Sequence, residues 1–559
     1  MRFKPFIPVV LIFLVAPIAC GAGGGGRLSL SGTVATVPSA PPGPLFVALA
    51  ATDDLAAIER DPLGTIKELI TVEESGGTFS IDLSGSELRA GDEIAIIAFV
   101  DSDYDGGVPY PTAGDMVGLY IDREAFSMTY RLREGANDGI SIEVNRVVYD
   151  FNASVSGSLE PDGPADCVLI AYAGEINSLD FTSLDFNAVI GYRKISVSGG
   201  NAPYTMKILP YGFDAPVSNV YLLALIDRNG NGVPDAGDGI GYYSDHPSGL
   251  PSLISIDRGN RTGIDIREKI VIPAPSGHAI SLAGSFIPPP AYGADSPPVF
   301  IIVARSSDPA ALFTDPLAVI RQFHRLPDGT SEFDIDLSTT GLAPGDEVMV
   351  LALWDLDFTA GFPDPGPGDY AGFYQNSGEL RSSIVLQEGR TTLRPGSDGW
   401  SFALKRKIFE HTASVLFTME AGALPVYGDN DRVIVVAVHR DGFNLLQMKI
   451  TDMDYIVGMT SLPLDFSTIQ SMNIFPALYG DPNTGDTIVG NPFELRDIYL
   501  FAVLDNTPAN GSADDGEYLG YYYTRIGINP FYIYLPAPFS VIDGPVTLPR
   551  GVRFTNQRY

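Results

Sequence analysis

Residues 220–243 read VYLLALIDRNGNGVPDAGDGIGYY: an apolar run, an acidic loop and a short aromatic segment. The apolar run ends abruptly at Asp227, and Asn, Asp, Gly and Pro residues typical of turns follow it. Neither flank shows the three-to-four-residue spacing of an amphipathic helix. The stretch therefore predicts two strands joined by a polar loop.

The same pattern occurs four times along the 559 residues. An apolar run with Ala three residues before its end stops each time at an aspartate, and the four aspartates are 126, 128 and 150 residues apart. Each copy closes on a similar segment: GDMVGLY, GDGIGYY, GDYAGFY or GEYLGYY. Such intervals are the size of domains and not of solenoid repeats. The four aspartates are Asp101, Asp227, Asp355 and Asp505.

The composition favours β structure, with 60 Gly, 44 Pro and 10% aromatic residues. Alternating segments such as TFSIDLS and EFDIDLS indicate strands with one buried face, about seven in each copy. We predict an all-β chain of four tandem antiparallel β-sandwich modules, with the continuous apolar runs as central strands. The predicted divisions are a leader and Gly tether over residues 1–26 and modules over residues 27–148, 149–275, 276–407 and 408–559.

Two features pair the modules as A–B–A–B. Modules one and three share DPLGTI and DPLAVI, and modules two and four share SLDFNAVI and PLDFSTIQ. The spacing within the acidic loops gives the same pairing. In the odd modules Asp61 and Asp315 precede a proline, which predicts a short helix with Asp as its N-cap and Pro at its first position.

The loop of the second module places oxygen-bearing groups at alternate positions. Positions 1, 3, 5, 7, 9 and 12 of this loop have the spacing of an EF-hand loop, with Gly232 at position 6. A cation of the size of Ca²⁺ takes 6 to 8 oxygen ligands, which such a loop can converge on one point. The expected ligands are Asp227, Asn229, Asn231, the Val233 carbonyl, Asp235 and Asp238.

The other loops keep part of this pattern. For loop one the expected ligands are Asp101, Asp103, Asp105 and Asp115, and for loop three they are Asp355, Asp357, Asp364 and Asp369. Loop four has Asp505, Asp514, Asp515 and Glu517 but lacks polar residues in its middle, so a solvated turn is favoured there. The alternative for every loop is an Asp/Gly turn that ends a strand. If calcium binds, it is expected to relieve repulsion between carboxylates and to stabilise the fold.

The loop between strand-like flanks resembles the calcium loops of dockerins and of the B-type repeat modules of bacterial surface adhesins. The wider pattern, SG-V followed by an apolar strand, a GDE turn, an acidic loop and G-Y, resembles the transthyretin-like modules of bacterial envelope proteins. This resemblance covers residues 27–559 at the level of pattern, and only loop two matches the metal motif closely. It implies a surface protein built of β-sandwiches.

The first 26 residues differ from the rest. MRFK is basic, residues 5–20 are apolar and end at Cys20, and GAGGGG follows. This order indicates a secretory signal. The cysteine after PIA resembles that of bacterial lipoproteins, which implies a lipid on Cys20 and attachment to a membrane, with the outer membrane favoured. Cleavage without lipidation, which would give a secreted or periplasmic chain, is the alternative. Cys167, in CVLIAYA, is expected to be a buried thiol.

The charge balance and the motifs exclude several functions. With 35 basic and 68 acidic residues, a net charge of −33 disfavours binding to nucleic acid. None of the five histidines lies in a zinc-protease motif, and there is no nucleophile elbow or P-loop, so the chain is not expected to be an enzyme. The favoured function is a calcium-binding envelope lipoprotein with a structural or adhesive role. The alternative is an accessory protein that binds glycans or peptides, and candidate partners are glycans and envelope proteins.

Overall fold

The computed structural model describes residues 27–52, 55–60, 62–72, 77–123, 125–176, 184–245, 249–306, 312, 316–358, 362–363, 365–376, 381–397, 399–422, 432–445, 447, 449–505, 518–528 and 531–558. It is 52% strand and 4% helix, which confirms the all-β class. No helix within these ranges is both long and apolar enough to cross a membrane.

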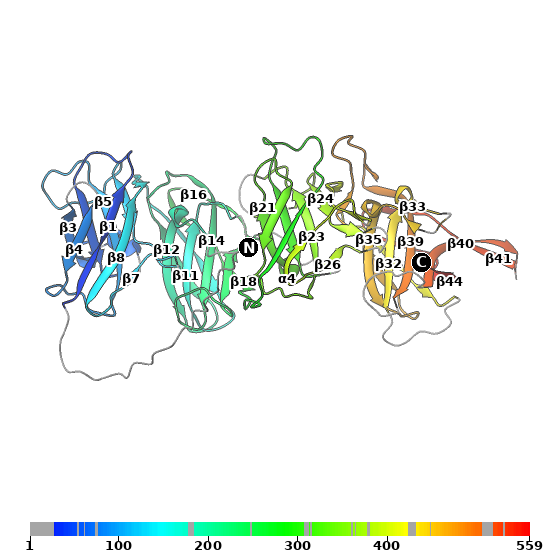
Figure 1. The fold of residues 1–559 in the computed structure, drawn as a ribbon, viewed down its shortest axis with the longest axis horizontal. Helices are drawn as coiled ribbons and strands as arrows, with labels where there is room; N and C mark the ends of the chain where they lie inside the picture. Colours follow the sequence, from blue (N-terminus) through cyan, green and yellow to red (C-terminus); the bar gives the residue numbers. More distant parts are fainter. Residues whose placement is uncertain are drawn as a thin grey trace, which may run out of the picture.

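The strands pair almost entirely within four consecutive segments of the chain, which lie in chain order along the long axis of the molecule (Figure 1). Segment one contains β1 (Ser29–Thr36), β2 (Leu45–Ala50), β3 (Ile66–Val72), β4 (Thr78–Asp82), β5 (Glu93–Val100), β6 (Met116–Leu119), β7 (Tyr130–Arg131), β8 (Ala136–Val144) and β9 (Arg146–Val147). Segment two contains β10 (Ala153–Glu160), β11 (Ala165–Tyr172), β12 (Val189–Val197), β13 (Ala202–Ile208), β14 (Val217–Asp227), β15 (Gly239–Tyr243), β16 (Ile254–Ile256), β17 (Gly259–Arg261) and β18 (Ile266–Val271).

Segments three and four repeat this order with longer connections. Segment three contains β19 (Ile280–Ser285), β20 (Val299–Ala304), β21 (Ile320–Arg325), β22 (Glu332–Asp336), β23 (Glu347–Trp354), β24 (Tyr370–Phe373), β25 (Gln375–Asn376), β26 (Ser383–Val385), β27 (Gly389–Thr392), β28 (Trp400–Ser401) and β29 (Arg406–Ile408). Segment four contains β30 (Ser414–Phe417), β31 (Met419–Glu420), β32 (Arg432–His439), β33 (Phe443–Asn444), β34 (Lys449–Ile450), β35 (Ile456–Pro463), β36 (Gln470–Asn473), β37 (Ala477–Tyr479), β38 (Val489–Gly490), β39 (Glu494–Asp505), β40 (Tyr518–Ile528), β41 (Phe531–Pro536), β42 (Phe539–Ile542), β43 (Pro545–Thr547) and β44 (Val552–Arg558). The module boundaries themselves stay a prediction.

Most strand pairs are antiparallel, as predicted, but each segment also contains parallel pairing that was not predicted. The first strand of a segment runs parallel to a strand near the end of the same segment: β1 with β8, β10 with β17 and β18, β19 with β27, and β30 with β43. The prediction of antiparallel pairing is therefore wrong only for these pairs, which involve the first strand of each segment. Alternation in the sequence shows which face of a strand is buried, but it does not show which strand lies beside it.

The continuous apolar runs are strands that are buried on both faces. In β2, Leu45, Val47 and Leu49 point into the core of segment one. The alternate residues Phe46 and Ala48 join a second apolar cluster that runs through segments one, two and three. The same division holds for β11 and β20. Each run therefore has no polar face because neighbouring structure covers the outer side of its sheet.

The glycine shared by the GLY, GYY and GFY segments allows a close approach between strands. A Cβ on Gly118 would lie 2.2 Å from the carbonyl oxygen of Glu143, and one on Gly372 would lie 2.3 Å from that of Ala403. Real side chains do not tolerate such distances. Glycine is therefore required where β6 passes close to the end of β8 and where β24 passes close to Ala403.

Short helices begin at the two prolines predicted to start them. The helix α2 spans Pro62–Thr65 and α4 spans Pro316–Val319, while α1 spans Leu55–Arg60. The predicted N-caps, Asp61 and Asp315, lie outside the described residues. The remaining described helices are the 3₁₀ turns η2 (Phe186–Ala188), η3 (Arg440–Gly442) and η4 (Met453–Tyr455).

A buried arginine joins segment one to segment two. Arg146, 3% exposed, donates hydrogen bonds to the carbonyl oxygens of Phe186 at 2.6 Å and Val189 at 3.1 Å, at the start and just past the end of η2. Burial lowers the pKa of Arg146 to about 10, so it remains charged at neutral pH. The backbone also crosses this joint, because Gly212 N donates to the carbonyl oxygen of Val147 at 2.8 Å.

An equivalent arginine joins segment three to segment four. Arg406, 2% exposed, donates to the carbonyl oxygen of Ile456 at 2.8 Å and to that of Met453, the matching positions around η4. The strand β29, which contains it, pairs with β37 of segment four. This joint was not predicted from the sequence. The two matching arginines support the A–B–A–B pairing.

The joint between segments two and three is built differently. Arg325 forms an ion pair with Glu175 at 2.6 Å, and the rings of Tyr221 and Phe362 lie 6.1 Å apart.

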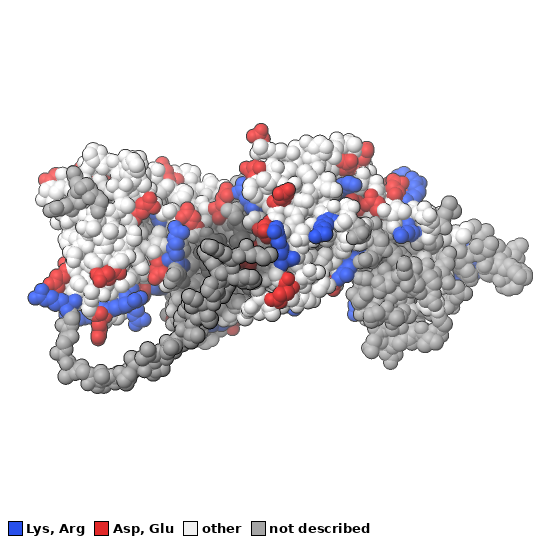
Figure 2. Space-filling model, viewed as in Figure 1, with Lys and Arg blue, Asp and Glu red and all other residues white. Residues whose placement is uncertain are grey.

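On the face shown in Figure 2, acidic and basic side chains are interspersed among uncharged ones on the described surface. The net negative charge is therefore not gathered into one patch on this face.

Candidate metal centres

The first and last acids of three loops are buried at the ends of paired strands. Loops one, two and three connect β5 to β6, β14 to β15, and β23 to β24. A carboxylate buried at a strand end needs hydrogen bonds or a cation. The buried acids are Asp101, Asp115, Asp227, Asp238, Asp355 and Asp369.

Loop one brings three carboxylates together. One oxygen from each of Asp101, Asp103 and Asp115 lies within 4.8 Å of the others. Asp115 is held by Ser102, whose backbone N and hydroxyl donate to Oδ1 at 2.8 and 2.7 Å, and by Thr112 N, which donates to Oδ2 at 2.7 Å. Burial would raise the pKa of Asp115, but these hydrogen bonds outweigh it and lower the pKa.

Asp101 is the least satisfied group of this loop. Its Oδ2 accepts a hydrogen bond from Tyr110 N at 3.3 Å, whereas its Oδ1 is buried and accepts none from the described residues. Burial raises the pKa of Asp101, and the nearby Asp103 and Asp115 raise it further. The predicted ligand Asp105 does not belong to this group, and its Oδ1 accepts from Gly107 N in a local turn.

Loop three repeats the geometry of loop one. Asp355, Asp357 and Asp369 each place an oxygen within 4.8 Å of the others. Asp369 accepts from Leu356 N at 2.8 Å and from Gly366 N at 2.7 Å, as Asp115 does in loop one. The predicted ligand Asp364 lies outside the described residues.

In loop two the polar side chains face one another. Asp227 accepts from Gly230 N and Gly232 N, both at 2.7 Å. The amides of Asn229 and Asn231 donate to the two oxygens of Asp235, at 2.8 and 2.5 Å. A cation here would replace these hydrogen bonds, and each amide would turn to present its oxygen.

The remaining residues of loop two behave as turn residues. Asp238 accepts from Arg228 N at 3.0 Å and from Asp235 N at 3.1 Å. Val233 has an exposed side chain, and its N donates to Asn231 Oδ1 at 2.7 Å. This set of bonds can close the loop without an ion, whereas loops one and three each bring three carboxylates within 4.8 Å of one another.

The acids of loop four and the two cysteines complete the predicted residues. In loop four, β39 ends at Asp505, and Asp514, Asp515 and Glu517 lie outside the described residues, as does Cys20. Cys167 is buried and unpaired with another cysteine, and burial raises its pKa to about 12. It is therefore a core thiol, as expected, and a poor nucleophile.

No protein-family model matches the chain, and no curated protein matches it. Several solved structures are similar to the chain at low identity. A proposed cell adhesion protein from Bacteroides ovatus is 13% identical over 47% of this chain and 97% of its own, with a TM-score of 0.15.

Two pilins are similar to the chain at the same level. The shaft pilin SpaA from Lactobacillus rhamnosus, as its D295N mutant, is 10% identical over 44% of this chain and 100% of its own, with a TM-score of 0.11. A streptococcal ancillary pilin is 12% identical over 66% of this chain and 99% of its own, with a TM-score of 0.13. At these values the likeness has no bearing on residue roles in this chain.

Proposed function

We propose that this chain is a non-catalytic, calcium-binding protein of the cell envelope with a structural or adhesive role. One observation supports the proposal of a bound metal ion. Asp101, which is 3% exposed, belongs to a group of three carboxylates, and one of its oxygens is buried without a hydrogen-bond donor among the described residues. Like charges this close repel strongly where water is excluded. A divalent cation would balance them.

The chemistry of the donors favours calcium over other ions. The group consists of oxygens alone, with no cysteine or histidine, which suits a hard cation. Calcium accepts irregular geometry and 6 to 8 oxygen ligands, whereas magnesium demands a near-ideal octahedron. Loop one, with exposed Asp103 and buried Asp101 and Asp115, leaves room for water ligands on its outer side.

The role follows from the position of the loops. Asp101 directly follows β5 and Asp115 directly precedes β6, and these strands pair in the same sheet. An ion held by both would tie the two strand ends together. The described flanks of loops one to three are strands and not a pair of helices, so binding is expected to stabilise the sandwich and not to open it.

Calcium titration into the purified chain tests this proposal. We expect calorimetry to detect saturable binding and the melting midpoint to rise by several degrees, because a ligand at 100 times its Kd stabilises by about 2.7 kcal/mol. EDTA should reverse the shift, and magnesium should have a smaller effect. The variant pair Asp101→Asn and Asp355→Asn should lose most of this response.

The matched control is Glu134→Gln, which removes an exposed carboxylate outside the loops and should keep the full calcium response. A melting midpoint that is the same with calcium and with EDTA in the unaltered chain would contradict structural calcium. This comparison uses the unaltered chain, so it holds even if the aspartate variants fold poorly.

The envelope location rests on the first 26 residues, and it includes a lipid on Cys20. If the lipid forms, the expressed chain should fractionate with membranes, and Cys20→Ser should move it to the soluble fraction. Mass spectrometry of the N-terminal peptide would show the added acyl mass. Equal membrane association of the two chains would instead favour signal cleavage without lipidation.

A further inference from the structure

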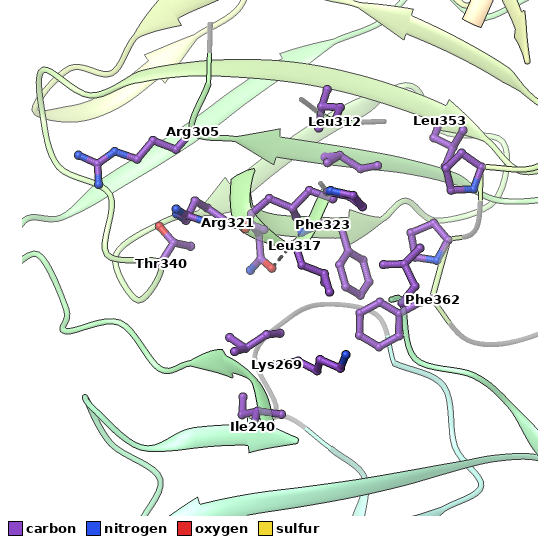
Figure 3. Close-up of a pocket in the computed structure, with 18 of the residues that line it drawn as sticks. Ile240, Lys269, Arg305, Leu312, Leu317, Arg321, Phe323, Thr340, Leu353 and Phe362 are labelled. Atoms are coloured by element: carbon purple, nitrogen blue, oxygen red, sulfur yellow. Dashed lines mark hydrogen bonds between the residues drawn. The ribbon is translucent and has the colours of Figure 1, made fainter. Parts of the chain in front are cut away.

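A cavity of about 1710 Å³ lies between segments two and three (Figure 3). Its walls come from β14, β15 and β18 on one side and from β20, β21 and β23 on the other. Pockets for small molecules usually measure about 300–1000 Å³, so an elongated molecule fits here. The arginine-linked joints of the other segments close directly on backbone carbonyls, whereas this joint leaves a partly open cavity.

The middle of the cavity is apolar. Leu223 and Ile240 line it from segment two, and Phe323, Leu353 and Phe362 line it from segment three. All five are less than a tenth exposed and belong to one cluster of buried apolar residues. Facing apolar walls are normally packed against each other without large voids. An apolar molecule lying along these walls would extend that packing.

Cations gather at one side of the cavity. Figure 3 shows Arg305 and Arg321 on one side, with Leu353 and Phe362 on the opposite side. Arg305 pairs with Asp346 at 2.8 Å, whereas Arg321 donates to the backbone carbonyls of Ala318 and Ile320. Burial, followed by the nearby charge of Arg305, lowers the pKa of Arg321. The two arginines share one carboxylate, which leaves a positive excess.

The facing wall adds a further cation. Lys269 is exposed at the edge of segment two and forms no ion pair with the residues that the structure describes. Three acids, Asp235, Asp357 and Glu410, also line the cavity, and the first two belong to the acidic loops. An anionic group is therefore expected beside the arginines and away from the loops.

Segment one shows that the arginines are not a general feature of the fold. Ala50 pairs with Ile66 in segment one as Ala304 pairs with Ile320 in segment three, so the residues equivalent to Arg305 and Arg321 are Ala51 and Lys67. Lys67 is neutralised by Glu87 at 2.8 Å. The positive excess is thus specific to the segment whose sheet faces the cavity.

We propose that the cavity between segments two and three binds a long-chain fatty acid. Its carboxylate would lie beside Arg305 and Arg321, where paired hydrogen bonds to guanidinium groups are available. Its acyl chain would lie along Phe323, Leu353 and Phe362. This inference is independent of calcium binding and of the lipid on Cys20.

Fluorescence titration with cis-parinaric acid, a fluorescent fatty acid, tests the proposal on the purified, delipidated full chain. We expect saturable binding at one site and displacement by palmitate. Hexadecanol, which has the same chain length without the charge, should displace the probe at least about tenfold less well, the equivalent of losing one charge-assisted contact. Equal displacement by palmitate and hexadecanol, or no saturable binding, would overturn the proposal.

Three variants locate the site. The double variant Arg305→Gln and Arg321→Gln should weaken binding by about tenfold or more, and Leu317→Trp should weaken it by filling the cavity that Leu317 lines. The matched control Lys67→Gln should bind as the unaltered chain does. If the double variant and Leu317→Trp both retain full affinity, the fatty acid binds elsewhere and the assignment is wrong. If a variant misfolds, the comparison of palmitate with hexadecanol still decides.

Discussion

Replacing Arg146 by Met is expected to weaken the joint between segments one and two by about 2–6 kcal/mol. The side chain is buried, and it donates to the carbonyl oxygens of Phe186 and Val189. A methionine of similar length fills the space but leaves both acceptors without donors, and each costs about 1–3 kcal/mol when buried. Arg146→Lys should recover only part of the loss, since an ammonium group lacks the planar fork that reaches two carbonyls.

Local stability is the suitable measure, because a chain of several sandwiches does not unfold in one step. Hydrogen exchange at η2 and at the start of β12 should quicken in Arg146→Met, as should proteolysis between the segments. Arg131→Met, which changes an exposed arginine of segment one, is the control and should change neither. Arg406→Met should act in the same way on segments three and four. Equal exchange in Arg146→Met and Arg131→Met would show that the joint does not depend on this side chain.

Asp454 is expected to make the second joint sensitive to pH. Asp454 is buried beside Arg406, and the Arg406 Nε lies 3.8 Å from the Asp454 Oδ1. The side-chain amide of Gln375 donates to the same Oδ1 at 2.6 Å, and the Lys405 Nζ lies 3.9 Å from the Asp454 Oδ2. Burial raises the pKa of Asp454 to about 6, Arg406 and Lys405 oppose that shift, and Asp452 adds to it. The net effect shows that burial outweighs the ion pair.

The sign of the pH dependence follows from this raised pKa. The unfolded carboxyl titrates near 3.8, so its contribution to stability is fully present below that pH and is lost as pH rises through about 6. This difference in pKa between the folded and unfolded states corresponds to about 3 kcal/mol of stability. Asp454→Asn should remove this loss, and asparagine already stands at the matching position of η2, as Asn187.

Unfolding of segment four in urea, monitored by hydrogen exchange at η4, checks this expectation when it is measured between pH 4 and pH 7.5. The unaltered chain should lose stability over that range, and Asp454→Asn should lose less. Asp481→Asn, at an exposed turn of the same segment, should keep the slope of the unaltered chain. A variant that is less stable than the unaltered chain at pH 7.5 would show that the ion pair with Arg406 dominates instead.

The strand–loop–strand repeats could be predicted because they depend on local chemistry. An apolar run that stops at Asp227 or Asp355 marks a strand end wherever the strand lies in the sheet. Proline at the first position of α2 and α4 works in the same local way. The parallel pair of β1 and β8 could not be predicted, since both strands alternate and nothing in alternation states the partner.

The candidate site could be predicted only in part. The first and last acids of loops one and three lie close together because they stand at the ends of paired strands, and their role as metal ligands stays a prediction. Asp105 does not join them, since the longer loop one turns back on itself at Gly107. The two joint arginines had a detectable signal, because Arg146 and Arg406 occupy matching places in modules one and three. The cavity had no signal, as it depends on the placement of two segments.

The parallel pairing of the first strand of each segment with a strand near its end determines how the molecule carries tension. In a parallel pair such as β1 and β8, the start of the first strand and the end of the second lie at opposite ends of the ladder. Pulling a segment by its two ends therefore slides one strand along the other and loads all of the ladder bonds together. An antiparallel pair would unzip one bond at a time. Every segment has this arrangement, so a chain stretched from end to end would meet shear resistance four times in series.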